Sequence, residues 1–257
     1  MIVGFIGVGS FASYLVEGLR RASPAPAIVL SPRNAERARA LAARHGARIA
    51  ADNQGVVDSA DVVILATLPQ QCAEVVQALR FRPGQRLVNM AAGVPLVDIK
   101  DAAQPALAVR AMTSSAAALR DSPGFLYPDD SVARDVLARF GPVHVMRDER
   151  ALEVASALFI YYAWMFRLMD EVVDWARENG LERSLARRLV ADTVAAASTV
   201  ARERSDETLA AILDRHTAPG GLTAHGLDLL GRAGAFGAWR RALDAVLNRA
   251  LGERDRG

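Results

Sequence analysis

The sequence has almost no cysteine, since Cys72 is the only one in 257 residues. A single cysteine excludes an intramolecular disulfide framework and any cysteine-rich zinc or iron–sulfur centre. We therefore expect no metal site, and a reducing compartment, the cytoplasm by default, as the location of the protein.

The chain also lacks a large excess of positive or negative charge and any apolar stretch long enough to span a bilayer. The chain has 31 basic and 29 acidic residues, a net charge of +2, and no run of five basic residues. Nucleic-acid-binding surfaces gather basic residues, so we expect no nucleic-acid partner. The longest uncharged apolar run lies between Glu153 and Arg167, which is shorter than the ~20 residues that span a bilayer. We expect no membrane segment.

The composition, with 51% hydrophobic and 23% charged residues, is typical of a folded globular protein. The first half alternates short β-branched runs with helical stretches, the pattern of parallel α/β units. We predict a doubly wound, Rossmann-like α/β domain over residues 1–148, with Asn34 capping a helix over Ala35–His45 that Gly46 closes. The predicted strands are Met1–Ile6, Ala27–Leu30, Arg48–Ala50, Val62–Thr67, Arg86–Met90 and Ala106–Met112, with a further candidate at Val143–Met146.

The second half has no strand-like run, and alanine, leucine and arginine recur there with helical periodicity. We predict an all-helical domain over residues 149–257. After a first long helix that ends at Gly180, further helices are expected at about 182–203, 206–215, 219–232 and 236–251.

The first long helix has two apolar stripes. One contains Leu152, Ala155, Phe159, Tyr162, Phe166, Met169, Val173 and Ala176, and the other contains Leu158, Tyr161, Met165, Leu168, Val172 and Trp175. A helix that is apolar on two sides is typical of one buried between partners. We expect a homodimer, or a higher oligomer built from it, in which a second subunit covers part of this helix. The alternative is that both stripes pack within one chain.

The chain carries a G-x-G-x-x-A motif directly after the first predicted strand and at the start of a helix. In such a motif Gly7 permits the tight turn, Gly9 lets the backbone approach a pyrophosphate, and Ala12 lets the helix pack close to the strand. The helix amino terminus then faces the phosphates. The motif predicts a dinucleotide site, and the alternative is a glycine-rich turn that serves packing alone.

The end of the second predicted strand carries no acidic residue. An NAD-specific site usually has an acid there, on the ribose hydroxyls, whereas this chain reads Leu30-Ser31-Pro32-Arg33-Asn34. A hydroxyl, a guanidinium and an amide suit a 2′-phosphate, so NADP(H) is favoured over NAD(H). The alternative makes Asn34 a helix cap only and Arg33 a solvated surface charge.

These motifs, with others along the chain, resemble those of the pyrroline-5-carboxylate reductase family over nearly the full length. The segments that carry the resemblance are Gly7-x-Gly9-x-x-Ala12, Ser31-Pro32-Arg33-Asn34, Asp61-Val62-Val63-Ile64-Leu65-Ala66-Thr67-Leu68-Pro69-Gln70, Ala91-Ala92-Gly93-Val94 and Ala218-Pro219-Gly220-Gly221-Leu222-Thr223. The resemblance implies an NAD(P)H-binding first domain, a helical dimerisation domain, and hydride transfer to a cyclic imine that gives proline.

The resemblance also implies roles for individual residues. Ser10 and Phe11 correspond to contacts with the pyrophosphate, Ser31 and Arg33 to contacts with the adenosine phosphate, and Asn53 to a contact on the adenosine side. Ala66, Thr67, Leu68 and Pro69 correspond to a loop along the cofactor, in which Leu68 replaces a common lysine. Ala92 and Gly93 correspond to residues beside the nicotinamide.

For the substrate, the resemblance implies that Thr223 hydrogen-bonds the imine nitrogen or donates its proton. Independently of it, Pro219 suits a first helical turn, and Gly220 and Gly221 leave N–H groups unobstructed for a carboxylate. The alternative is that these glycines serve close helix packing only. His216 and His225 flank the segment, and we expect neither to be catalytic.

The chain departs from the family near the expected substrate. The family's Ser-Gly-Ser-Gly-Pro-Ala-Tyr is Phe159-Ile160-Tyr161-Tyr162-Ala163-Trp164-Met165 here, and its Pro-Asn-Thr-Pro is Thr113-Ser114-Ser115-Ala116. These large side chains would either fill substrate volume or serve the dimer core. Three hypotheses follow: reduction of pyrroline-5-carboxylate, a paralogue that reduces another imine or carbonyl compound, or a non-catalytic NADP-binding regulatory protein.

Overall fold

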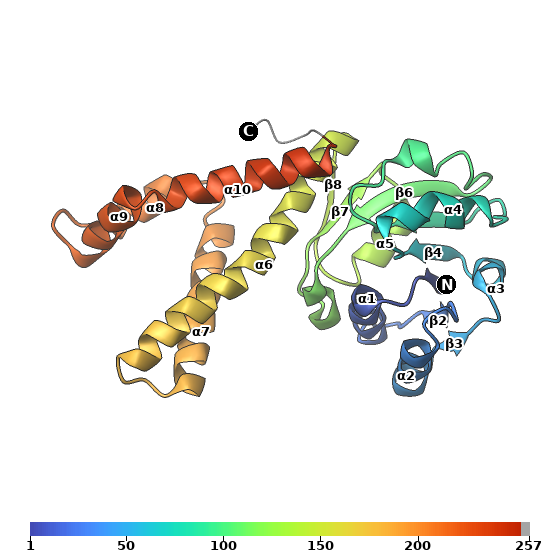
Figure 1. Cartoon of the computed structure of the whole chain (residues 1–257), viewed down its shortest axis with the longest axis horizontal. Helices are drawn as coiled ribbons and strands as arrows, with labels where there is room; N and C mark the ends of the chain where they lie inside the picture. The colour runs from blue at the N-terminus through green and yellow to red at the C-terminus, as the bar shows by residue number, and fades with distance from the viewer. Residues whose placement is uncertain (253–257) are drawn as a thin grey trace. The chain divides into compact units, whose positions relative to one another are not determined.

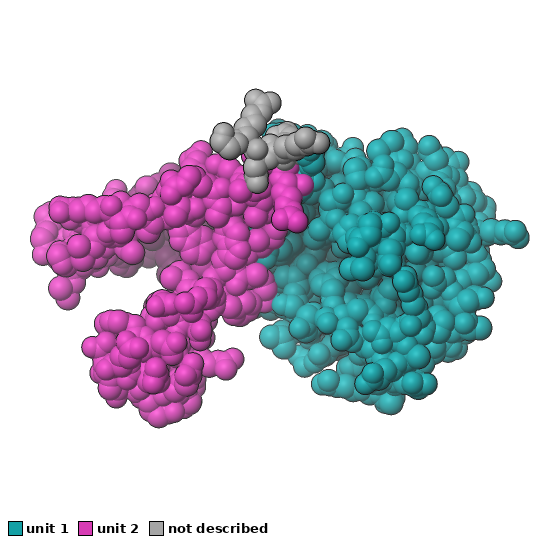
Figure 2. Space-filling model, in the orientation of Figure 1, with its two compact units in different colours: residues 1–159, 250–253 teal, residues 160–249, 254–257 magenta. Residues whose placement is uncertain are grey.

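The computed structural model describes residues 1–252 of the chain. Within this range, residues 1–159 with 250–252 form one compact unit, and residues 160–249 form the other (Figure 2). Each unit has its own architecture and is described separately below.

Over the described residues, the first unit is built on one eight-stranded sheet with the order β3-β2-β1-β4-β5-β6-β7-β8. The strands are β1 Ile2–Ile6, β2 Ala27–Leu30, β3 Arg48–Ile49, β4 Val62–Leu65, β5 Arg86–Asn89, β6 Leu107–Met112, β7 Gly124–Tyr127 and β8 Val143–Val145. Neighbouring strands from β3 through β2, β1, β4 and β5 to β6 pair in parallel. Strand β7 is antiparallel to β6, and β8 is parallel to β7. The doubly wound α/β prediction is confirmed.

All seven predicted strands are present, but the sequence interpretation missed β7. This strand has four residues and lies between Pro123 and Pro128. Its pairing with β6 is antiparallel, so it does not follow the strand–helix–strand pattern on which the other predictions relied.

Helices cover both faces of the sheet (Figure 1). They are α1 Ser10–Arg20, α2 Ala35–His45, α3 Asn53–Ser59, α4 Cys72–Gln77 and α5 Ser131–Leu137, with short 3-10 turns η1 Pro69–Gln71, η2 Leu96–Asp98 and η3 Ser115–Leu119. Strand β4 shows how the cores divide, because Val62 and Ile64 pack with α1, α2 and α5 while Val63 and Leu65 pack with α3 and α4. Such two-sided burial is typical of a parallel sheet.

The predicted ends of α2 are confirmed. The Asn34 side chain accepts a hydrogen bond from the Arg37 backbone N–H, and Gly46 adopts a left-handed φ of 62°. Local capping chemistry therefore fixes where the chain turns after β2, which places Arg33 and Asn34 beyond the carboxyl end of that strand.

The second half of the chain is helical throughout its described residues, as predicted. Its helices are α6 Glu149–Glu178, α7 Arg183–Glu203, α8 Leu209–Arg215, α9 Leu222–Arg232 and α10 Ala235–Ala250. The Glu182 side chain caps α7, and hydrogen bonds from the Ser184 hydroxyl and the backbone N–H groups of Ser184 and Leu185 lower the pKa of Glu182 to about 2.

Two helices start later than predicted. Helix α8 begins at Leu209 instead of Asp206, because the Thr208 hydroxyl accepts a hydrogen bond from the Ala211 N–H and caps the helix there. Helix α9 begins at Leu222 instead of Pro219. At α8 the capping residue decides the start more strongly than helical periodicity does, whereas α9 has no side-chain cap and follows a turn in which Gly220 has a φ of +75°.

The two apolar stripes of α6 are covered unequally within the chain. Val173 and Ala176 are buried against Ala186 and Val190 of α7. In contrast, much of the second stripe is exposed, and Trp175 is 64% exposed. The exposed members of that stripe include Leu158, Tyr161, Leu168, Val172 and Trp175.

Helix α6 is the only helix among the described residues that is long and apolar enough to cross a membrane by length and composition. A single helix of this kind is weak support for a membrane span, because long helices of soluble proteins pass the same test. The expected absence of a membrane segment therefore stays a prediction.

Candidate cofactor site

The turn from β1 into α1 has the geometry that the glycine motif predicts. Gly7 has a φ of +92°, and a Cβ there would lie 2.5 Å from the Ala66 carbonyl oxygen. At Gly9, the residue before α1, an added Cβ would meet nothing within 4 Å. Ala12, in the first turn of α1, is fully buried. Only glycine fits at Gly7 for conformational reasons, whereas Gly9 leaves open space in front of the helix amino terminus.

A cleft of about 890 Å³ opens beside this turn at the carboxyl ends of β1, β2, β4 and β5. In a doubly wound sheet this is where ligands bind. Among its lining residues are most of the cofactor residues expected from the sequence, namely Gly7, Gly9, Ser10, Phe11, Ser31, Arg33, Asn34, Asn53, Ala66, Thr67, Leu68, Pro69 and Ala92. Ala12 and Gly93 are outside the lining.

Ser31 links two sides of the cleft. Its hydroxyl accepts a hydrogen bond from the Gly7 N–H at 3.1 Å, and the residue is fully buried. The end of β2 is thereby tied to the β1–α1 turn. Contact with a cofactor phosphate stays a prediction for this residue.

Two arginines lie at the β2–α2 side of the cleft with neutral partners. Arg33 donates to the Gln71 side-chain oxygen at 3.0 Å, and Arg37 donates to the Ser10 hydroxyl at 3.0 Å. Over residues 1–252, neither arginine forms an ion pair within 4.0 Å. Glu36 also lines the cleft but pairs with neither arginine, so both guanidinium groups can bind an anionic ligand group.

The sequence interpretation missed Gln71 and Arg37. Gln71 belongs to no motif, and only the folding of η1 beside the β2–α2 loop brings it to Arg33. Arg37 lies one helical turn after Asn34, so the helix prediction together with the 2′-phosphate hypothesis could have found it. Gln71 lines the cleft, whereas Arg37 is outside the lining and reaches it through its hydrogen bond to Ser10. Further lining residues without a sequence signal include Ile6, Val8, Ala35, Glu36, Val75, Met90 and Ala91.

The single cysteine lies directly behind the cleft. Cys72 is buried, and its sulfur lies 3.3 Å from the Thr67 hydroxyl oxygen. Burial raises the pKa of the Cys72 thiol, so the thiol stays protonated near neutral pH and is a poor nucleophile. Its contact supports the Thr67 loop. In the described part of the chain, no three His, Cys, Asp or Glu side chains gather as a metal site.

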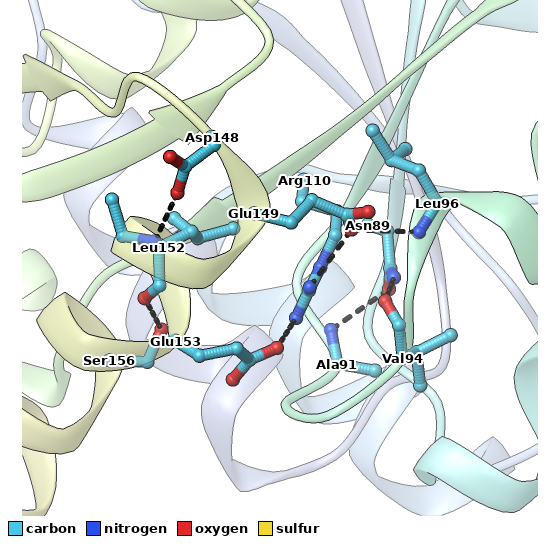
Figure 3. Close-up of polar contacts among 11 residues, drawn as sticks. Asn89, Ala91, Val94, Leu96, Arg110, Asp148, Glu149, Leu152, Glu153 and Ser156 are labelled. Atoms are coloured by element: carbon cyan, nitrogen blue, oxygen red, sulfur yellow. Dashed lines mark hydrogen bonds and ion pairs between the residues drawn. The ribbon is translucent and has the colours of Figure 1, made fainter. Parts of the chain in front are cut away.

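At the β5 side, the cleft is bordered by a loop that Asn89 holds. The Asn89 side-chain oxygen accepts from the Ala91 N–H at 3.0 Å, and its amide nitrogen donates to the Val94 carbonyl at 3.3 Å (Figure 3). This buried amide spans the loop that contains Ala92 and Gly93, and it fixes that loop at both ends.

The glycine segment before α9 differs from the sequence prediction. Pro219 is outside the helix, Gly220 has a φ of +75°, and the Gly221 N–H donates to the Ala218 carbonyl at 2.9 Å. The predicted first-turn proline is therefore wrong, and the amide of Gly221 already has an acceptor. Thr223 is exposed in the first turn of α9.

The segments that depart from the family have partners inside their own units. Phe159 stacks on Phe125 of β7 with ring centroids 4.7 Å apart, and Tyr161 contacts Trp239 of α10 at 5.6 Å. The hydroxyl oxygens of Ser114 and Ser122 lie 2.7 Å apart in a buried cluster. The first two contacts give the large side chains packing roles.

A doubly wound sheet with this glycine turn and this cleft defines a dinucleotide-binding domain of the Rossmann class. Comparisons with known proteins add the family. Residues 149–252 match the family model described as pyrroline-5-carboxylate reductase dimerisation, and residues 2–93 match one described as NADP oxidoreductase coenzyme F420-dependent.

A pyrroline-5-carboxylate reductase of Pseudomonas aeruginosa is 30% identical to this chain, over 96% of the chain and 95% of that protein. Pyrroline-5-carboxylate reductase 1 of Bacillus subtilis is 28% identical, over 96% and 88%. In structure, 1-pyrroline-5-carboxylate reductase from Streptococcus pyogenes has a TM-score of 0.86, 26% identity and 98% coverage of both chains. The chain belongs to the pyrroline-5-carboxylate reductase family.

The solved structure of Plasmodium falciparum pyrroline carboxylate reductase, which has NADP bound, is similar in fold, with a TM-score of 0.82 and 18% identity. The predicted domain boundary after residue 148 stays a prediction: the dimerisation model begins at 149, whereas the first compact unit extends to Phe159.

The two glycines of the turn give a paired prediction. Gly9→Ala has space and an ordinary backbone conformation, so its unfolding free energy should stay within about 0.5 kcal/mol of the parent value, whereas its NADPH affinity should fall at least about tenfold because the methyl group blocks the phosphate. Gly7→Ala should lose roughly 1–3 kcal/mol of stability through backbone strain. Denaturant unfolding and calorimetry measure both, and parental NADPH affinity in Gly9→Ala would contradict this assignment.

Proposed function

We propose that this chain is an NADPH-dependent reductase that reduces the C=N bond of 1-pyrroline-5-carboxylate to give proline. The observation that carries the proposal is the similarity to pyrroline-5-carboxylate reductases along nearly the whole chain, combined with a cleft lined by the residues that the family resemblance implies for the cofactor.

The residues of the cleft fit NADP(H). The open space at Gly9 and the free N–H groups at the start of α1 suit a pyrophosphate. Arg33 and Arg37 offer unneutralised guanidinium groups for the 2′-phosphate that distinguishes NADP from NAD. When bound, NADPH supplies the hydride for the reduction.

The chain's own contribution to the reaction is binding and orientation. We assign to the Thr223 hydroxyl the hydrogen bond to the imine nitrogen. The first backbone N–H groups of α9, which lack a side-chain cap, would hold the substrate carboxylate together with Gly220. Pro219 and Gly221 shape this turn. The Gly221 N–H donates to the Ala218 carbonyl and is therefore not free for the substrate.

A second candidate is a paralogue that reduces a different imine or carbonyl compound. The observation that favours it is the changed sequence at Phe159–Met165 and Thr113–Ala116, in the two segments that resemblance places near substrate. A non-catalytic NADP-binding protein is a third candidate with the same support. The packing roles of Phe159 and Tyr161 favour the first function, because they explain the large side chains without a change of substrate.

We also propose that the chain works as a homodimer, or a higher oligomer built from it, in the cytoplasm and without a nucleic-acid or membrane partner. The exposed stripe of α6 and the match of residues 149–252 to a dimerisation model support a second copy as its cover. Arg167, Asp170, Glu171 and Asp174 lie along the same helix, and their charges suit this cover better than lipid.

Cofactor preference tests the arginine assignment. NADPH should bind more tightly than NADH, and Arg33→Ala should reduce that preference by roughly 10- to 100-fold, the equivalent of a lost charged hydrogen bond. Arg39→Ala is the matched control, because Arg39 is an exposed arginine of α2, the helix that follows the Arg33 loop, and it does not line the cleft. It should leave the preference unchanged. Calorimetry that shows equal NADPH and NADH affinity in the parent protein would sink the assignment.

Removal of the Thr223 hydroxyl tests the catalytic assignment. Thr223→Val keeps the side-chain shape, so NADPH affinity should be unchanged, while turnover of the imine should fall by roughly 10²- to 10³-fold if the hydrogen bond strengthens in the transition state. The measurement is steady-state NADPH oxidation over a range of imine concentrations that reaches saturation. Turnover and Michaelis constant both within about twofold of the parent values would show that Thr223 has no such role here.

The assembly prediction is measured by light scattering. At micromolar concentration the protein should have at least twice the 27.5 kDa mass of one chain. Leu168→Asp, within the exposed stripe, should shift the mass toward one chain, because it buries a charge at the contact. Leu119→Asp is the control, since Leu119 is exposed in the first unit. A monomeric parent protein would refute the proposal.

A further inference from the structure

The first unit contains a buried ion cluster that the proposed mechanism does not use. Arg110 of β6 is 2% exposed, and its two terminal nitrogens pair with two carboxylates at the start of α6 (Figure 3). One partner is Glu149, at 3.0 Å, and the other is Glu153, which is itself buried. Buried charges are costly, and apolar side chains of similar size are often as stabilising. The cluster therefore calls for an explanation beyond stability.

The cluster is connected to the cleft through Glu149. The same Glu149 oxygen that accepts from Arg110 also accepts from the Leu96 backbone N–H at 2.9 Å. Asn89, the partner of Arg110 in the β5–β6 register, holds Ala91 and Val94. The loop of residues 90–96 is thus fixed by Asn89 along its first part and by Glu149 at its far end.

This loop borders the half of the cleft that faces away from the β2–α2 arginines. Met90, Ala91 and Ala92 are among the lining residues. In a Rossmann domain the adenosine half of a dinucleotide lies toward β2, and the other half lies across the switch point, over β4 and β5. On the proposed function, the 90–96 loop therefore faces the nicotinamide half.

We propose that Arg110 is a positioning residue for the nicotinamide half of the cofactor, and that it acts through Glu149 on the 90–96 loop. The guanidinium orients the Glu149 carboxylate, and that carboxylate anchors the loop at Leu96. The second ion pair of Arg110, with Glu153, fixes the first turns of α6 to the same point on β6. The planar fork of arginine can serve both carboxylates at once, which a lysine ammonium cannot do with the same geometry.

The test compares Arg110→Lys with Arg86→Lys in the full-length chain. Arg86 is a matched control because it opens β5 at the opposite end of the strand, pairs with the buried Asp130 at 3.0 Å and lines no part of the cleft. Calorimetry measures two ligands: NADPH, and 2′,5′-ADP, which carries the adenosine and the 2′-phosphate but no nicotinamide.

We expect Arg110→Lys to weaken NADPH binding by roughly tenfold, the equivalent of one charged hydrogen bond, and to leave 2′,5′-ADP binding within about twofold of the parent value. Arg86→Lys should change neither affinity. Glu149→Ala should give the same pattern as Arg110→Lys, and it tests the proposal independently if the lysine variant does not fold, because the Glu149 side chain is partly exposed.

An equal loss of affinity for both ligands in the Arg110 and Glu149 variants would show a structural role only and overturn the proposal. Unchanged NADPH affinity in either folded variant would also overturn it. The inference rests on the proposed function, and the parent protein separates the two: a parent that binds neither ligand refutes the cofactor assignment itself, whereas a parent that binds both leaves the variants to decide.

Discussion

The β1–α1 turn is the constraint on which the rest of the cofactor site depends. Gly7 can adopt its positive φ and lie against the Ala66 backbone only because it has no side chain. Its N–H is held by the Ser31 hydroxyl. One residue thereby joins the carboxyl ends of β1, β2 and β4, which leaves the amino terminus of α1 open at Gly9 for an anionic group.

From this turn the cleft extends toward β2 on one side and toward β5 on the other, and the two sides are built from different interactions. The β2 side has positively charged side chains. Arg33 and Arg37 donate to neutral partners there, so their charge is available to a ligand. The β5 side is held by buried hydrogen bonds. Asn89 and the cluster around Arg110 fix the backbone of the 90–96 loop and place no charged side chain of that loop in the cleft. The first arrangement suits recognition of a phosphate, and the second suits placement of a neutral ring.

Much of this could be predicted from the sequence, because the signals are local. The glycine motif, the Asn34 cap and the β-branched runs each depend on a few neighbouring residues. Strand β7 was missed because antiparallel pairing of four residues between prolines leaves no such pattern. The contact of Arg33 with Gln71 and that of Arg110 with Glu149 join residues far apart in sequence, so only the fold reveals them.

We infer that this chain, which keeps the family's cofactor residues and has a changed sequence at Phe159–Met165, still reduces the family substrate. The most direct measurement is NADPH oxidation with 1-pyrroline-5-carboxylate, 1-pyrroline-2-carboxylate and larger cyclic imines, with product identified by mass. We predict the highest kcat/KM for 1-pyrroline-5-carboxylate, with one proline formed for each NADPH oxidised. A higher kcat/KM for another imine, or NADPH binding without oxidation by any of them, would contradict it.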